Sequence, residues 1–138
     1  NIFVISVFLF SAILISKTHD DFSYYHFTFT KYLTEQKVIF GMGLMGHGYK
    51  LISSLFFLNS SFYLPFIDYF SFHFTSLYFL IFFNFFVFKE IISKKTHEIA
   101  KCLYLFAFVF FNLSFTRIAE FGTDKVGQIL IVILIIVL

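Results

Sequence analysis

Residues 69–88 read YFSFHFTSLYFLIFFNFFVF and contain no acidic or basic side chain other than His73. Twenty helical residues rise about 30 Å, which matches the hydrocarbon core of a bilayer. The polar members of the run are His73, expected to be neutral and hydrogen-bonded, and Asn84. The run therefore predicts a transmembrane helix, and the rest of the chain is interpreted around it.

The composition supports the same conclusion. Hydrophobic residues make up 59% of the chain and charged residues only 13%, a balance typical of integral membrane proteins. The net charge of +2 is spread through the loops, which argues against a nucleic-acid partner. The single cysteine, Cys102, excludes an internal disulfide and a cysteine-based zinc site; we expect it to pack as a small apolar side chain.

Three further apolar segments flank this run on its two sides. Residues 1–16 predict a first span, residues 102–115 a third, and residues 129–138 part of a fourth. We therefore expect an all-α, polytopic membrane protein with about four transmembrane helices. Residues 1–138 are expected to form a single transmembrane region, which we interpret as a fragment of a longer chain.

The segment 17–65 is more polar and is predicted to be an external loop with two interfacial helices. At helical spacing, Asp21 and Tyr25 share one face of the first helix, residues 17–36, while Phe22 and Phe29 lie on the other. Such an amphipathic pattern favours a helix lying in the plane of the interface. The second interfacial helix is expected within residues 50–63, ending before Pro65.

The distribution of lysines predicts the orientation. Four lysines fall within residues 89–101, and the positive-inside rule places this loop in the cytoplasm. Residues 17–68 and 117–128 are then expected outside the cytoplasm, on the same side of the membrane.

Two pairs of acids would meet on that outer side: Asp20 and Asp21 after the first span, and Glu120 and Asp124 before the last. Together these carboxylates could hold a divalent cation, Mg²⁺ or Mn²⁺, and through it a phosphate. One of them could instead act as a general base. Arg117 is a candidate for bidentate contact with a phosphate group.

Each pair of acids also has an ordinary structural interpretation. Asp20 and Asp21 could cap and orient the helix that follows them. Glu120 and Asp124 could pair with Arg117 and Lys125 in a solvated loop.

Residues 40–48, FGMGLMGHG, contain four of the six glycines of the chain. Such density predicts a loop rather than a helix. The segment lacks the Gly-Lys-Ser/Thr ending of a nucleotide-binding P-loop. It is either a flexible turn or a site where glycine amides and His47 contact a ligand.

Three stretches carry a resemblance to a known family: HDDFSYYH (19–26), LFFLNS (55–60) and RIAEFGTD (117–124). A span, then an acidic pair opening an amphipathic helix, then a second external helix, resembles the N-terminal part of GT-C membrane glycosyltransferases. The chain looks most like a group of large, mostly uncharacterised bacterial polytopic membrane proteins. The resemblance covers nearly all of its length.

The resemblance implies an enzyme of the bacterial inner membrane that transfers a sugar from a polyprenyl-phosphate donor at the external face. Its partners would be membrane lipid and that donor. The catalytic base would be Asp21, favoured over Asp20 because Asp21 shares a helical face with Tyr25. Candidate substrate-binding residues are Tyr25, His26, His47, Arg117, Glu120 and Asp124.

A metal is not a firm expectation, because many GT-C enzymes work without one and the spacing of Glu120 and Asp124 differs from the usual acidic pairs of the family. The alternative to an enzyme is a non-catalytic polytopic protein, such as a transporter or an envelope-assembly subunit. A third interpretation is a segment that only supports the remainder of a longer protein.

Overall fold

The fold is all-α, as the sequence predicts. The computed structural model describes residues 3–4, 7, 10, 20–36, 40–50, 53–114, 121–122 and 124–137. Five α-helices form within these residues: α2 (Phe27–Glu35), α3 (Ser54–Ser61), α4 (Phe74–Ile92), α5 (Glu98–Leu113) and α6 (Asp124–Val137). Most of the expected first span, residues 1–16, lies outside the described residues.

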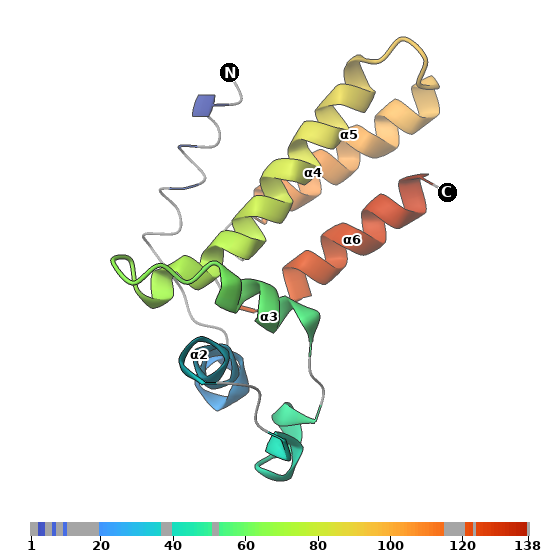
Figure 1. Cartoon of the computed structure of the whole chain (residues 1–138). Helices are drawn as coiled ribbons and strands as arrows, with labels where there is room; N and C mark the ends of the chain where they lie inside the picture. Colours follow the sequence, from blue (N-terminus) through green and yellow to red (C-terminus); the bar gives the residue numbers. More distant parts are fainter. Residues whose placement is uncertain are drawn as a thin grey trace.

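Helices α4, α5 and α6 pack alongside one another as a bundle (Figure 1). Helix α5 begins after the short loop 93–97, where the Nδ1 atom of His97 accepts a hydrogen bond from the backbone N–H of Ile99 at 3.3 Å. Such a cap satisfies one of the N–H groups that a helix start leaves without an intrahelical partner. The bundle core consists of apolar side chains that the three helices share: Leu77, Leu80, Phe83, Val87, Tyr104, Ala107, Phe111 and Ile129.

Helix α4 continues a 3₁₀ turn, η4 (Tyr69–His73), and the combined segment Tyr69–Ile92 has 24 residues. Within the described part of the chain, this segment alone is long and apolar enough to cross a membrane. Helices α5 and α6 have 16 and 14 residues, fewer than the about 20 that a perpendicular crossing needs. The segment confirms the helix predicted from residues 69–88.

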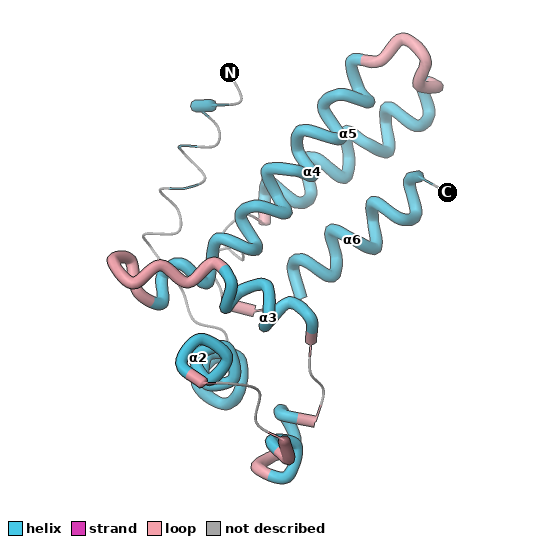
Figure 2. The backbone as a smooth tube through the Cα atoms, viewed as in Figure 1, coloured by secondary structure: helices cyan, strands magenta, loops and turns pink. Residues whose placement is uncertain are grey.

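Helices α2 and α3 pack on each other across one end of the bundle, away from the loop 93–97 (Figure 2). Helix α2 follows a π-helical turn, η1 (Phe22–His26). Phe29 from α2 and Phe56 from α3 are buried with Met42 in a second apolar cluster. Both helices predicted for residues 17–65 therefore form, although each is shorter than its predicted segment.

The glycine-rich segment forms a loop with two short 3₁₀ turns, η2 (Met42–Leu44) and η3 (His47–Tyr49). Gly41 has φ 88°, a left-handed conformation that glycine adopts without the steric cost of a Cβ atom. The loop is attached to α2 through the hydroxyls of Tyr49 and Thr28, which lie 2.8 Å apart. The prediction of a loop rather than a regular helix is confirmed.

Two side chains differ from their expected environments. Cys102 is exposed on α5 rather than packed, because the composition of an apolar helix does not reveal which of its faces meets a neighbour. His73, expected to be hydrogen-bonded, is buried, and its Nδ1 atom has no hydrogen-bond partner among the described residues.

Candidate functional site

Asp21 and Tyr25 form a polar pair at the start of η1. The backbone carbonyl of Asp21 accepts hydrogen bonds from the N–H groups of Tyr25 at 3.2 Å and His26 at 3.3 Å, which defines the π-helical turn. The side chain of Asp21 makes no capping hydrogen bond; it interacts with the Tyr25 phenol instead and contributes to the raised pKa of that phenol. Asp21 is thus not the side-chain cap that one interpretation of the sequence expected.

The charge of Asp124 also acts on Tyr25. Asp124 is the exposed first residue of α6, and α6 begins at the end of the bundle where α2 and α3 lie (Figure 1). Burial raises the pKa of the Tyr25 phenol above 10.0, and the negative charges of Asp21 and Asp124 raise it further. One acid of each predicted pair therefore acts electrostatically on the same phenol.

Gly48 fixes the position of Tyr25. A Cβ atom placed on Gly48 would lie 2.5 Å from both Cγ and Cδ1 of the Tyr25 ring. Only glycine allows this close approach of the loop to the ring. The Tyr25 ring also packs against α3, where it meets Phe56 edge to face with ring centroids 6.3 Å apart.

The remaining predicted site residues fall into three environments. Asp20 and His47 are exposed, one in the turn before η1 and the other at the first position of η3. His26 is buried among rings, with its centroid 5.5 Å from that of Phe56, which is the environment of a core residue. Arg117 and Glu120 lie outside the described residues.

The described residues do not form a metal centre. No group of three or more histidine, cysteine, aspartate or glutamate side chains is close enough there to hold an ion.

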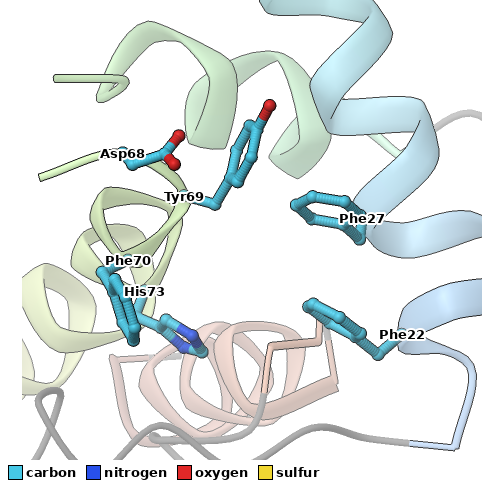
Figure 3. Close-up of a pocket in the computed structure, with 6 residues that line it drawn as sticks. All are labelled: Phe22, Phe27, Asp68, Tyr69, Phe70 and His73. Carbon is cyan, nitrogen blue, oxygen red and sulfur yellow. The ribbon is translucent and has the colours of Figure 1, made fainter. Parts of the chain in front are cut away.

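A cavity of about 240 Å³ lies beside η1, and no pattern in the sequence indicates it (Figure 3). Its lining comes from η1, the start of α2 and the segment around η4, and consists of Phe22, Phe27, Asp68, Tyr69, Phe70 and His73. These residues belong to segments more than 40 positions apart in the chain. Only the tertiary packing of η1 against η4 brings them together.

No family model, curated protein or solved structure matches this chain. The role of the site is therefore argued from its own geometry and chemistry.

Proposed function

We propose that this chain belongs to a GT-C-like membrane glycosyltransferase, which transfers a sugar from a polyprenyl-phosphate donor at the external face of the membrane. The observation that carries the proposal is that the negative charges of Asp21 and Asp124 both act on the Tyr25 phenol, whose pKa they raise together with burial. A carboxylate held by a neighbouring hydroxyl at the end of a helical bundle has the chemistry of a general base for an incoming acceptor.

The outer surface of the bundle supports a membrane location. Large apolar side chains are exposed on all three bundle helices, including Phe82 on α4, Phe106 on α5 and Ile135 on α6. Exposed apolar side chains in this number suit lipid contact better than water. With residues 1–16, these helices would make the about four spans of the proposed protein, with α2 and α3 lying at the interface.

The charges at the two ends of the bundle support the proposed orientation. Lys94 and Lys95 are exposed in the loop at one end, and Asp20 and Asp124 are exposed at the other. The positive-inside rule would place the lysines in the cytoplasm and the acids outside.

In the proposed reaction, the acceptor hydroxyl attacks the anomeric carbon of the donor while Asp21 accepts the hydroxyl proton. The bond between that carbon and the phosphate oxygen breaks, and the polyprenyl phosphate leaves with the electron pair, so the anomeric centre is inverted. Tyr25 would hold the Asp21 carboxylate in place through its phenol. Asp124 would stabilise the positive charge that develops on the sugar ring.

Sugar transfer in native membranes tests the proposal. Radiolabelled sugars on polyprenyl phosphate are supplied as a panel, and both the transferred label and the released polyprenyl phosphate are measured. Asp21→Asn should reduce transfer by about 10²–10⁴-fold, since that is the usual contribution of a general base. The matched control is Glu35→Gln, because Glu35 is an exposed carboxylate of the same region and is paired with Lys31 at 3.7 Å. Equal transfer by Asp21→Asn and wild type would contradict the assignment and favour the non-catalytic alternative.

Cysteine labelling tests the topology independently of activity. With Cys102 replaced by serine, single cysteines at Ser23 and Lys94 would be probed with an impermeant maleimide from each side. Ser23→Cys should react only from outside and Lys94→Cys only from inside. Labelling of both positions from the same side would contradict the membrane-spanning arrangement.

A further inference from the structure

The cavity beside η1 is lined by four aromatic rings, one carboxylate residue and one imidazole. Its lining combines the rings of Phe22 and Phe27 with the carboxylate of Asp68 and the imidazole of His73. We propose that this cavity binds an alkylammonium group, supplied either by a lipid headgroup or by a small soluble amine. This inference goes beyond the proposed sugar transfer and does not depend on it.

His73 provides the first argument. Its side chain is only 6% exposed, and its Nδ1 atom has no hydrogen-bond partner among the described residues. The imidazole extends across the cavity toward Phe22 (Figure 3). A buried neutral imidazole offers one nitrogen as an acceptor, and leaving it unpaired is costly. An N–H group of a primary ammonium, or the hydroxyl that choline carries beside its quaternary nitrogen, would supply the missing donor.

Asp68 provides the anionic group. It has φ 59°, a conformation that residues other than glycine rarely adopt, although asparagine and aspartate do so more often than most. The turn holds this conformation because the Asp68 N–H donates to the Leu64 carbonyl at 2.8 Å, and the Asp68 carbonyl accepts from the Ser71 hydroxyl at 2.7 Å. The turn thereby places Asp68 in the lining of the cavity. Its carboxylate accepts a hydrogen bond from the Tyr63 hydroxyl at 3.4 Å and can also pair with a cation.

The aromatic walls complete the site. The rings of Phe22 and Phe27 stack with centroids 5.0 Å apart, and Phe27 meets Tyr69 edge to face at 4.7 Å. Aromatic faces attract ammonium groups, most strongly where water is excluded. The ring of Tyr69 already makes a cation–π contact with the Nζ atom of Lys31, which lies 5.3 Å from the ring centroid.

The size of the cavity limits the ligand. A volume of about 240 Å³ is below the about 300–1,000 Å³ of sites that hold drug-sized ligands. It suits a choline or ethanolamine group and excludes a whole lipid, whose chains would have to remain outside.

Choline binding to the full chain tests the chemistry. The protein is placed in phosphatidylglycerol nanodiscs, and radiolabelled choline binding is measured by equilibrium dialysis. Asp68→Asn should weaken binding at least about 10-fold through loss of the charge, and Phe27→Leu about 3- to 10-fold through loss of the ring face. Asparagine tolerates a positive φ, so Asp68→Asn should fold; Glu35→Gln is the control and should bind as wild type.

The uncharged analogue of choline, 3,3-dimethylbutan-1-ol, separates an ammonium site from a merely apolar one. It should compete at least about 10-fold less well than choline. Equal competition, or choline binding by Asp68→Asn equal to that of Glu35→Gln, would overturn the proposal.

A second measurement identifies the source of the ammonium group. Native mass spectrometry compares the retention of phosphatidylethanolamine and phosphatidylglycerol by wild type and Asp68→Asn. A preference for phosphatidylethanolamine that Asp68→Asn loses would assign the cavity to a lipid headgroup. Choline binding without any lipid preference would assign it to a soluble amine, and the absence of both would overturn the inference.

Discussion

Asn84 of α4 and Asn112 of α5 exchange two side-chain hydrogen bonds across the bundle. The Nδ2 atom of Asn84 donates to Oδ1 of Asn112 at 2.9 Å, and Nδ2 of Asn112 donates to Oδ1 of Asn84 at 2.8 Å. Between helices that are otherwise apolar, such a reciprocal pair is satisfied in only one register. It therefore specifies how α4 and α5 align.

Asn84→Leu should destabilise the bundle by about 1–2 kcal/mol, because Asn112 would keep a half-buried amide without its main partner. Thermal unfolding in micelles, followed by far-UV circular dichroism, measures the change. The control is Phe82→Leu, at an exposed position of the same helix, which should leave the melting temperature nearly unchanged. The double variant Asn84→Leu/Asn112→Leu should lose less stability than the sum of the losses in the two single variants. Additive losses would show that the two amides are not coupled.

Gly48→Ala should lower stability by about 1–3 kcal/mol, because the new Cβ atom would overlap the Tyr25 ring. The chain offers a matched control in Gly127→Ala, since a Cβ atom on Gly127 of α6 meets nothing within 4 Å. That substitution should be neutral or raise stability by up to about 1 kcal/mol through better helix propensity. The comparison is made by thermal unfolding of both variants, and equal melting temperatures would contradict the close packing at Tyr25.

The helices could be predicted from the sequence because each depends on a local pattern. The apolar run 69–88 specifies most of α4, and the alternation of polar and apolar faces specifies α2. The high density of glycine between residues 40 and 48 correctly predicts a loop between α2 and α3. The prediction that Asp21 and Asp124 lie on the same side of a membrane stays a prediction.

The non-local contacts could not be predicted in this way. Asn84 pairs with a residue 28 positions away, and nothing in either helix alone indicates which polar side chains will face each other. The cavity depends on Asp68 and on His73, which the sequence presented as one polar residue of an apolar run. The π-helical turn at Phe22–His26 likewise has no clear local signal, although it sets the direction of Tyr25 and His26.

Phe56→Ala should destabilise the packing of α3 on α2 by about 3–5 kcal/mol, the usual cost of removing a buried ring. Phe56 is 2% exposed, whereas the next residue, Phe57, is 43% exposed. Phe57→Ala is therefore a control of identical chemistry and should cost less than about 1 kcal/mol. Denaturant unfolding gives both values, and limited proteolysis should cut the α2–α3 region faster in Phe56→Ala alone. Similar losses for both substitutions would contradict the packing of α3 on α2.

Tyr25 should titrate at a higher pH than an ordinary tyrosine. Subtracting the absorbance titration of Tyr25→Phe at 295 nm from that of wild type should leave one phenol with a pKa above 10.0. Asp21→Asn should lower this pKa without returning it to 10.0, because burial, the largest cause of the shift, remains. The control is Tyr24→Phe, which removes the hydroxyl of an exposed neighbouring tyrosine and should leave the pKa of Tyr25 unchanged.

The same shift predicts the sign of a stability change with pH. The folded protein holds the phenolic proton of Tyr25 more tightly than the unfolded chain does, whose pKa is 10.0. This contribution to the free energy of unfolding is fully present below pH 10 and is lost as the pH rises through the folded-state pKa. Unfolding measured from pH 8 to above pH 10 should therefore show a steeper loss of stability in wild type than in Tyr25→Phe. If the stability of wild type and of Tyr25→Phe fell in parallel with pH, or if the Tyr25 phenol titrated at or below pH 10, the burial of Tyr25 and its interactions with Asp21 and Asp124 would be contradicted.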